Sequence, residues 1–538
     1  MSGDLDAGLV LAATVPAPSI EYGKLSPMLI VFGAAVIGVL VEAFVPQRMR
    51  YLTQMVLGLG GLIAALVAVI ALAGTDATAA VGAVAVDGVT LFLQGTLLVV
   101  SILGLLFIGQ RMPATRSGPG TWSRAAARSG FQLEAFTPQA SAVPGSGAEK
   151  AAAAAGVAAT EVFPLTMLAV GGLLLFPASN DLLTMFVALE VLSLPLYLLC
   201  GLARRQRLLS QEAALKYFLL GAFSSAFFLY GVALLYGATG TVRLGGIADG
   251  LAADSGDATL ALLGVAMLAV GLLFKIGAVP FQSWVPDVYQ GAPTPITAFM
   301  AAATKIAAVG ALLRVLQVAV PGLADDWRPV LGAIAVATMV VGAVMAITQT
   351  DVKRMLAYSS VAHAGFLLTA LVAANEAGVS SVLFYLLTYG LSTLGAFALV
   401  SLVREASGEE ATALERWAGL GRRSPWLASG FALLLLSFAG LPLTSGFVAK
   451  FAVFQAAADG DAGYLVIIGV LASAVAAFFY IRVIVLMFFT EPPANPPVIT
   501  APPVTGGVIA VTAAVTLVLG LVPQPVLDLA TEAAHFAR

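Results

Sequence analysis

The chain is poor in charged residues. Aspartate, glutamate, lysine and arginine make up 10% of its 538 residues, whereas a soluble globular chain carries about 25%. Hydrophobic residues make up 60%, and the mean hydropathy is +0.99. These values exclude a soluble globular protein and predict an all-α polytopic protein of the lipid bilayer. A net charge of -3 gives no reason to expect a nucleic-acid partner.

Residues that hold redox groups are nearly absent. The single cysteine, Cys200, excludes a disulfide framework and an iron–sulfur cluster. The two histidines, His363 and His535, lie far apart in the sequence, which argues against a bis-histidine haem or a zinc site. We therefore expect the chain to bind no cofactor and no metal, and to carry no electrons itself.

Long apolar runs dominate what is present. A helix needs about 20 apolar residues to cross a hydrocarbon core of about 30 Å, and fourteen segments meet this requirement. The predicted spans are 27–45, 52–73, 89–109, 162–177, 182–202, 213–237, 258–285, 295–320, 330–349, 355–374, 379–403, 426–458, 464–489 and 504–522.

The seventh and twelfth spans are too long for one crossing and too short for two. Each contains an interior proline, Pro280 or Pro442, in similar text, GAVPF and AGLPL. Because proline removes a helical hydrogen bond and crowds the preceding turn, we expect both helices to be broken. The two spans are five apart, and an odd offset reverses direction across the membrane. We therefore predict two inverted five-helix repeats, spans 4–8 and 9–13, as in transporters.

Basic residues gather in alternate loops. The loops after odd-numbered spans carry sixteen lysines and arginines, whereas the opposite loops and both tails carry four. By the positive-inside rule the first set is cytoplasmic, so we expect a multi-pass protein of the inner (plasma) membrane with both termini on the outer side. Asp4 and Asp6 stand where a cleaved signal peptide would carry basic residues.

We expect a single membrane domain over residues 1–538, in five parts. One part is rich in Ala, Ser, Gly, Pro and Arg, a composition typical of a flexible cytoplasmic insertion. The parts are three N-terminal helices (27–110), this insertion (111–159), the first repeat (160–322), the second repeat (323–490), and the last helix with the tail (491–538).

Four of the seven lysines fall within apolar runs: Lys216, Lys275, Lys305 and Lys450. An ammonium group at mid-membrane is costly, so such residues face a paired or hydrated interior. Lysine can release its proton when it is desolvated, whereas arginine stays charged. The chain therefore places the cation that can titrate where a proton carrier is needed. Lys216 lies close to the cytoplasmic end of its span and could instead extend to the headgroups.

One carboxylate lies at membrane depth. Glu190 is about 12 Å into the fifth span, and Lys275, beside the break in the seventh, is its natural partner. Such a pair titrates as a unit, so a cation that draws Glu190 away lowers the proton affinity of Lys275. A static ion pair that locks two helices together is the alternative reading.

His363 lies at the centre of the tenth span and can bind or pass a proton near neutral pH; a histidine that is merely hydrogen-bonded is the alternative.

Each candidate carrier falls near the middle of its span or beside a break. We predict a polar line at nearly one depth in the membrane, with Lys216 aiding proton access from the cytoplasm. Its order is Glu190, Lys275, Lys305, His363, Lys450.

Three stretches carry a family resemblance: PFQSWVPDVYQGAPTPITAFMAAATKIA from Pro280, EAALKYFLLGAFSSAFFLYG from Glu212, and DVKRMLAYSSVAHAGF from Asp351. In these, and over nearly the whole chain outside 111–159, the sequence resembles the antiporter-like subunits of the proton-pumping NADH:quinone oxidoreductase, respiratory complex I. The resemblance implies fourteen transmembrane helices, broken seventh and twelfth helices, and a chain of ionisable residues at mid-membrane.

By position, Glu190 and Lys275 match that family's glutamate–lysine pair, Lys305 its central lysine and Lys450 its terminal group. Subunit M usually has glutamate at the position of Lys450. Subunit L usually has histidine where Lys305 stands and continues into a long lateral helix, which does not follow Val522 here. The pattern therefore fits the remaining antiporter-like subunit.

The resemblance implies that the chain translocates protons while other subunits bind NADH, flavin, iron–sulfur clusters and quinone. Its implied neighbours are the antiporter-like subunit M on one side and the small subunits K and J on the other. A subunit of a multisubunit Na+/H+ antiporter is the nearest alternative. The sequence motifs YQGAPTP and ATKIA argue against it. A purely structural subunit is a second alternative, but it would not need several buried lysines.

Overall fold

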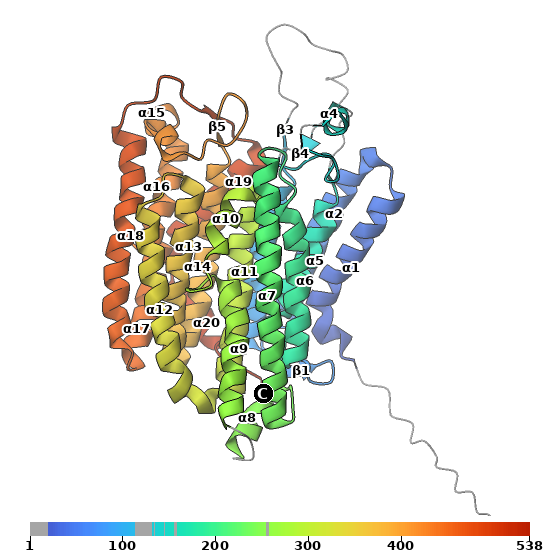
Figure 1. The fold of residues 1–538 in the computed structure, drawn as a ribbon, viewed down its shortest axis with the longest axis vertical. Helices are drawn as coiled ribbons and strands as arrows, with labels where there is room; N and C mark the ends of the chain where they lie inside the picture. The colour runs from blue at the N-terminus through green and yellow to red at the C-terminus, as the bar shows by residue number, and fades with distance from the viewer. Residues whose placement is uncertain are drawn as a thin grey trace, which may run out of the picture.

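The computed structural model describes residues 20–112, 132–133, 135–144, 146–154, 159–253 and 258–537. The chain forms a bundle of long helices, most of which run along the longest axis of the molecule (Figure 1). In the described ranges twelve helices are long and apolar enough to cross a membrane, and two further apolar helices are shorter. The prediction of an all-helical polytopic membrane protein is confirmed.

Short strands and one-turn helices occur only between the long helices of the described chain. The α-helices are α1 (Tyr22–Phe44), α2 (Gln47–Ala71), α3 (Gly88–Ile108), α4 (Gly147–Ala154), α5 (Val162–Leu175), α6 (Leu182–Cys200), α7 (Arg207–Thr239), α8 (Leu244–Ala252), α9 (Ala258–Ile276), α10 (Trp284–Gly291), α11 (Thr294–Arg314), α12 (Ala324–Ile347), α13 (Val352–Ala373), α14 (Glu376–Val400), α15 (Leu420–Arg423), α16 (Pro425–Ala439), α17 (Ser445–Asp459), α18 (Gly463–Phe489), α19 (Pro503–Leu521) and α20 (Gln524–Glu532). The π-helix η1 (Val315–Ala319) and the 3-10 helices η2 (Pro321–Leu323) and η3 (Leu414–Trp417) join them. The antiparallel strand pairs are β1 (Ala77–Ala79) with β2 (Val84–Val86), β3 (Arg111–Met112) with β4 (Gln132–Leu133), and β5 (Val403–Arg404) with β6 (Val498–Ile499).

Each span predicted from the sequence overlaps a helix. The seventh span corresponds to α9 and α10, and the twelfth to α16 and α17. Among the largest boundary differences is that at α7, which begins at Arg207 rather than at residue 213. Its first turns are polar, so hydropathy alone does not report them although the backbone hydrogen bonds continue.

Both interrupted helices end at a glycine with a left-handed backbone. Gly277 has φ +80° and Gly440 has φ +82°, a conformation that costs glycine little because it has no Cβ. The next N–H in each case bonds back to the fifth preceding carbonyl, Ala278 to Leu273 at 3.0 Å and Leu441 to Leu436 at 3.1 Å. This is the Schellman ending of a helix. The expected cause of the break was therefore wrong in detail, because glycine ends the helix before the proline is reached.

Side chains from the following half-helix donate hydrogen bonds to backbone carbonyl groups at both breaks. Trp284 Nε1 donates to the Phe274 carbonyl at 3.0 Å. Lys450 Nζ donates to the carbonyls of Phe438 at 2.8 Å and Ala439 at 3.2 Å. Because unpaired backbone carbonyls are costly at membrane depth, each break is stabilised by the segment that follows it.

The helices after α3 pack in two similar sets. In the first set α5 packs on α6, α6 on α7, and α7 on α10. In the second set α12 packs on α13, α13 on α14, and α14 on α17. The order of neighbours is therefore the same in the two halves of the chain.

The most deeply buried helices are α11, α13 and α14. In α11 and α13 every residue of the most apolar stretch is buried, and in α14 94% are. In helices α1, α2, α18 and α19 only 28–39% of the corresponding apolar stretch is buried. The exposed helices are apolar all round, as expected for surfaces that face lipid. Lys305 and His363 therefore lie at the centre of the bundle.

Part of the 111–159 stretch packs against the bundle. The Thr137 N–H donates to the Leu202 carbonyl at 2.9 Å, and Arg207 Nη1 lies 2.8 Å from Glu149 Oε1 of α4. Figure 1 shows β3, β4 and α4 together at one end of the bundle. The expectation of a wholly flexible insertion is corrected for these residues, because a buried ion pair and backbone hydrogen bonds hold them; 113–131, 134, 145 and 155–158 lie outside the described residues.

A buried ion pair joins α3 to α11 at the opposite end. Arg314 Nη2 donates to both carboxylate oxygens of Asp87, at 2.7 and 2.8 Å, and the two side chains are 0% and 1% exposed. Asp87 also caps α3 by accepting from the Thr90 N–H. Its second oxygen accepts from the Ala537 N–H at 2.9 Å. The last residues of the described chain therefore complete this contact.

Candidate functional site

Lys275 is the last cationic residue of α9, one residue before the break. Its side chain is buried, and Nζ donates to the Tyr217 hydroxyl at 3.2 Å. The same nitrogen lies 4.9 Å from the centre of the Tyr217 ring and 5.4 Å from that of Tyr197. Aromatic faces attract a cation, so two tyrosines provide the polar surroundings of this lysine.

Glu190 of α6 does not form a direct ion pair with Lys275. No nitrogen–oxygen distance between these two described side chains is within 4.0 Å, and Glu190 Oε1 is buried without a hydrogen-bond partner. Tyr197 lies next to both groups, since it faces Lys275 and is in the electrostatic range of Glu190. Glu190 also lies within electrostatic range of Lys275, so the expected partners act on each other through space without a direct ion pair.

Lys305 lies in the middle of α11 and bonds to α13. Its Nζ donates to the Ser360 hydroxyl at 2.7 Å and to the Ser360 carbonyl. It also lies 5.5 Å from the centre of the Tyr389 ring of α14. Among the described residues no carboxylate lies within ion-pairing distance of it, so the ammonium is held by neutral oxygens and an aromatic face.

His363 of α13 has a partner on each ring nitrogen. Nδ1 lies 2.6 Å from the Tyr385 hydroxyl, and Nε2 lies 3.4 Å from the Tyr480 hydroxyl. The ring stacks on Tyr389 with centres 4.6 Å apart. A histidine bonded on both sides can receive a proton at one nitrogen and give it up at the other.

Lys450 of α17 bonds to the break that precedes it. Besides the carbonyls of Phe438 and Ala439, its Nζ donates to the Ser473 hydroxyl of α18 at 2.6 Å. It lies 4.6 Å from the centre of the Phe366 ring. The lysine therefore meets the same kind of environment as Lys305, with neutral oxygens and an aromatic face.

Aromatic rings connect the second half of the predicted line. The Tyr389 ring is near both Lys305 and His363. The Phe438 ring packs on His363, and the Phe438 carbonyl accepts from Lys450. A cavity of about 10 Å³ beside His363, Tyr389 and Ser437 has room for about one water. The structure thus brings Lys305, His363 and Lys450 together.

The first half of the line is separated from Lys305 by aromatic residues of α10. Trp284 stacks on Tyr217 with centres 4.7 Å apart, and Tyr289 packs 6.2 Å from Trp284. Both rings are buried. The packed rings of Tyr217, Trp284 and Tyr289 therefore continue from Lys275 into the bundle.

Lys216 lies at the end of the bundle rather than in its core. Its side chain is 42% exposed and pairs with Glu212 at 2.7 Å and with Asp287 of α10 at 2.8 Å. Asp287 also pairs with Arg354 of α13 at 2.8 Å. Instead of extending alone to the headgroups, Lys216 belongs to an ion-pair cluster that ties α10 to both halves of the bundle.

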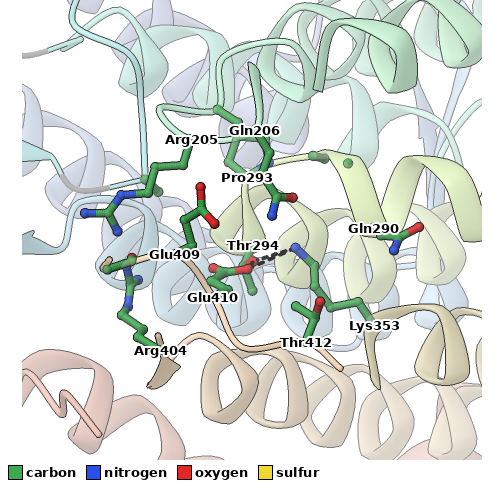
Figure 2. Close-up of a pocket in the computed structure, with 15 residues that line it drawn as sticks. Arg205, Gln206, Gln290, Pro293, Thr294, Lys353, Arg404, Glu409, Glu410 and Thr412 are labelled. Atoms are coloured by element: carbon green, nitrogen blue, oxygen red, sulfur yellow. Dashed lines mark hydrogen bonds and ion pairs between the residues drawn. The ribbon is translucent and has the colours of Figure 1, made fainter. Parts of the chain in front are cut away.

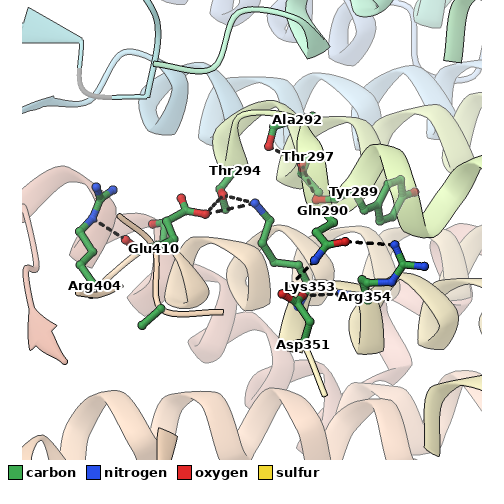
Figure 3. Close-up of polar contacts among 12 residues, drawn as sticks. Tyr289, Gln290, Ala292, Thr294, Thr297, Asp351, Lys353, Arg354, Arg404 and Glu410 are labelled. Carbon is green, nitrogen blue, oxygen red and sulfur yellow. Dashed lines mark hydrogen bonds and ion pairs between the residues drawn. The ribbon is translucent and has the colours of Figure 1, made fainter. Parts of the chain in front are cut away.

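A second polar cluster, which the sequence did not reveal, lies at the same end. Glu410 Oε2 accepts from Thr294 Oγ1 at 2.5 Å and from Lys353 Nζ at 3.1 Å, and Lys353 also bonds to Thr294 at 2.9 Å (Figure 3). These residues line a cavity of about 60 Å³ (Figure 2). In the sequence only Thr294, within the motif GAPTP, could have pointed to this cluster. A single glutamate in a loop does not suggest a buried site.

Electrostatics keep Glu410 ionised. Burial by itself raises the pKa of this carboxyl, but the charges of Lys353 and Arg404 and the hydrogen bond from Thr294 outweigh it and lower the pKa below its ordinary value. The lowered pKa stabilises the folded chain at neutral pH. That contribution is lost only as the pH falls through the lowered pKa.

Comparisons with known proteins place this geometry in a family. Residues 179–476 match the family described as "NADH:quinone oxidoreductase/Mrp antiporter, TM". The chain is 68% identical to NADH-quinone oxidoreductase subunit N of Rhodococcus opacus, over 98% of this chain and 99% of that protein. The chain belongs to the subunit N family. It is also 63% identical to subunit N of Mycobacterium tuberculosis, over 97% of this chain and all of that protein.

Two solved structures share this fold. A chain of respiratory complex I from Thermus thermophilus with bound aureothin is 34% identical, with a TM-score of 0.73, over 93% of this chain and 98% of that chain. A chain of the Mrp complex from Dietzia sp. is 21% identical, with a TM-score of 0.77, over 96% and 97%. The second likeness shows the fold alone, and the antiporter-like fold is therefore established.

In the described part of this subunit N family member, no cluster of three or more His, Cys, Asp or Glu side chains could hold a metal ion. The site residues predicted from the sequence thus divide into three groups. Lys305, His363 and Lys450 are connected, Glu190 and Lys275 share a tyrosine, and Lys216 lies in a peripheral ion-pair cluster.

Proposed function

We infer that the chain is a proton-translocating subunit in the membrane arm of a respiratory NADH:quinone oxidoreductase, complex I. Curated subunit N relatives are 57–68% identical over nearly the full length, whereas the likeness to the Mrp complex is 21% identity. This difference favours the oxidoreductase over a multisubunit Na+/H+ antiporter. Buried titratable groups in connected positions disfavour a purely structural role.

The observation that carries the proposal is the connected row Lys305, His363 and Lys450 in the buried centre of the bundle. Each side chain is at most 5% exposed, yet each has hydroxyl or carbonyl partners through which a proton can be passed. Protons cannot cross apolar packing alone, so a row of titratable and hydroxylated groups supports conduction. In this proposal the proton moves along Lys305, His363 and Lys450 at mid-membrane depth.

Glu190 and Lys275 form the first part of the line in this proposal. Lys275 is held by Tyr217, and Tyr197 lies beside both ionisable groups. A change in the charge of Glu190 therefore alters the proton affinity of Lys275 through space and through the shared tyrosine. Lys216, paired with Asp287, aids access from the cytoplasmic side.

We further propose fourteen transmembrane helices arranged as two inverted five-helix repeats, with the five-part division of the chain given above. The two Schellman endings, at Gly277 and Gly440, and the equal order of neighbours in the two halves support this arrangement. Each repeat then contributes one broken helix to the proton path.

We propose that both termini lie on the outer side of the plasma membrane. The start of α1 and the C-terminal end lie at the same end of the bundle (Figure 1), and the opposite end carries the basic loops. Subunit M and the small subunits K and J are the proposed neighbours. NADH, flavin, iron–sulfur clusters and quinone are bound by other subunits.

Substitution of Lys305 tests the proposed function. Lys305→Ala removes the carrier and Lys305→Arg retains a charge that does not release its proton, so both variants should lower the rate of NADH-driven proton pumping by about tenfold or more. Pumping is measured in membrane vesicles that contain the assembled complex, and assembly is checked by copurification. Lys24→Arg, at the start of α1, is the matched control. Wild-type pumping by assembled Lys305→Arg would contradict the proposal.

A further inference from the structure

The turn between α6 and α7 is fixed by one buried hydroxyl group. Helix α6 ends at Cys200 and α7 begins at Arg207. Ser210, in the first turn of α7, is fully buried. Its Oγ donates to the Cys200 carbonyl at 2.6 Å and accepts from the Ala203 N–H at 3.2 Å. The end of α6 is therefore tied to the start of α7.

The described part of the 111–159 stretch covers this turn. Phe136 pairs with Ala203 in an antiparallel bridge, and the Arg204 N–H donates to the Ala135 carbonyl at 2.9 Å. The Phe136 side chain is buried beneath this contact. The stretch therefore lies on the turn as a strand-like segment, held by backbone hydrogen bonds.

Arg207 fastens the covering segment to α7. Its side chain is 4% exposed. Nη1 lies 2.8 Å from Glu149 Oε1 and donates to the carbonyls of Ala142 at 3.2 Å and Gln139 at 3.3 Å, and Nη2 donates to the Ala140 carbonyl at 2.9 Å. A guanidinium group has a planar fork of donors and can bind several acceptors at once. We call Arg207 together with residues 139–142 and Glu149 the clamp.

The face of α7 that carries the clamp leads to Lys275. Arg207, Ser210 and Tyr217 are buried and follow one another at helical spacing, so they lie on one face of α7. The Tyr217 hydroxyl accepts the hydrogen bond from Lys275 Nζ. The rise from Arg207 to Tyr217 is about 15 Å along a continuous helix. A helix is a rigid element, so a shift of its first turn is carried to the tyrosine.

Helix α6 presents its own tyrosine to the same lysine. Tyr197 lies one turn before the end of α6. Its ring packs on that of Tyr217 with centres 4.6 Å apart, and its hydroxyl leaves no room for a Cβ at Gly221 of α7. The two helices must therefore keep one close register for both tyrosines to face Lys275.

We propose that Arg207 is a positioning residue for proton transfer at Lys275: the clamp fixes the α6–α7 turn and thereby keeps Tyr197 and Tyr217 against the lysine. The proposal rests on the function proposed above, in which Lys275 carries a proton. The hydrogen bonds of Arg207 all go to the clamp, so it acts on the lysine through the two helices.

A double-mutant cycle tests whether Arg207 acts through Tyr217. In vesicles containing the assembled complex, Arg207→Ala and Tyr217→Phe should each lower the rate of NADH-driven proton pumping severalfold. The combined variant should pump no more slowly than Tyr217→Phe alone, whereas the losses from two residues this far apart would add if they acted independently. Arg204→Ala is the matched control: its side chain is in the same turn and forms no hydrogen bond or ion pair with the described residues, so pumping should match wild type.

The pH profile of pumping separates positioning from simple stabilisation of the fold. The ionisable groups that face Lys275 are Glu190, Tyr197 and Cys200 on α6 and Tyr217 on α7. A displaced Tyr217 changes the proton affinity of Lys275, so Arg207→Ala should shift the pH profile in the same direction as Tyr217→Phe. Arg204→Ala should keep the wild-type profile. Arg207→Lys retains the charge but loses the planar fork; it should shift the profile in the same direction by less, and it replaces Arg207→Ala if that variant does not assemble.

Three results would overturn the clamp's role: wild-type pumping by assembled Arg207→Ala, fully additive losses in the combined variant, or slow pumping with an unshifted pH profile. Lys275→Ala distinguishes this failure from failure of the proposed function. If Lys275→Ala stops pumping while Arg207→Ala behaves like wild type, only the positioning role fails. If Lys275→Ala pumps normally, the proposed function of Lys275 fails and the role of Arg207 fails with it.

Discussion

The three buried lysines of the predicted line, Lys275, Lys305 and Lys450, are stabilised by different groups, and in the described chain none of the three has a carboxylate within ion-pairing distance. Lys275 faces tyrosine rings, Lys305 a serine, and Lys450 the free carbonyls of a break. Neutral partners hold an ammonium less firmly than a carboxylate would. A lysine with such partners can lose its proton without leaving an unpaired buried anion behind. The arrangement suits a carrier better than a fixed ion pair does.

We predict that a residue with a permanent positive charge cannot replace Lys275. Lys275→Arg should lower NADH-driven proton pumping about as much as Lys275→Ala, by about tenfold or more, because arginine does not release its proton. Both rates are measured in vesicles containing the assembled complex. Glu190→Gln combined with Lys275→Ala should add little to Lys275→Ala alone, since coupled groups are non-additive. Full additivity of the two losses would show that the groups act separately.

The sequence predicted which ionisable residues are buried, because an isolated lysine in an apolar run is conspicuous. It did not predict their partners. Tyr217 and Tyr389 look like ordinary core residues in the sequence, and only the packing of α7 on α9 and of α11 on α14 brings them to the lysines. Glu410 was not predicted because loop glutamates are common and its burial depends on the ends of α11 and α13.

Among the helices, the two breaks are the most informative elements. Hydropathy and proline placed them correctly along the chain, since the spans were too long for one crossing. The sequence did not show that glycine, in a left-handed conformation, ends each helix, or that Trp284 and Lys450 bind the freed carbonyls. Those features depend on backbone geometry and on contacts from the next half-helix. The second break is therefore both a helix ending and part of the Lys450 site.

We predict that Gly440→Ala damages pumping beyond its effect on stability. A Cβ at this position would lie 2.9 Å from Lys450 Cδ, and the left-handed backbone costs about 1–2 kcal/mol for a residue other than glycine. Gly240→Ala has the same backbone strain at φ +72° but open space around the Cβ. Both variants should lower the thermal midpoint similarly, and only Gly440→Ala should slow NADH-driven pumping by severalfold. Equal pumping rates in the two variants would show that the break at Gly440 takes no part in proton pumping.

Considered as a whole, the molecule has two chemically different ends. One end gathers the ion pairs Lys216–Asp287, Arg354–Asp287 and Lys353–Glu410, and the other holds the buried Asp87–Arg314 pair. The all-helical membrane architecture and the alternation of loop charge were readable from composition. The packing of part of residues 111–159 was not, because its composition is that of a flexible segment and its order comes from Glu149 and Arg207.

Single cysteines test the proposed orientation of the whole bundle. Ser407→Cys, in the loop beside Glu410, should react with a membrane-impermeant thiol reagent in inside-out vesicles only. Thr531→Cys, in α20, should react in right-side-out vesicles only; both side chains are exposed. The wild-type chain should remain unlabelled because Cys200 is buried. The opposite labelling pattern would reverse the topology.

The contact between Asp87 and the Ala537 N–H has a consequence for biogenesis. The two residues are 450 positions apart, so a ribosome inserts Asp87 into the membrane long before it makes its last partner. Arg314 must arrive first to neutralise the carboxylate, and the amide near the C-terminal end comes last. Until then α3 and α11 meet around an incompletely bonded acceptor in apolar surroundings. This contact therefore cannot close until the residues after α20 have been made, so shortening the chain before Ala537 should leave Asp87 without one of its hydrogen-bond donors.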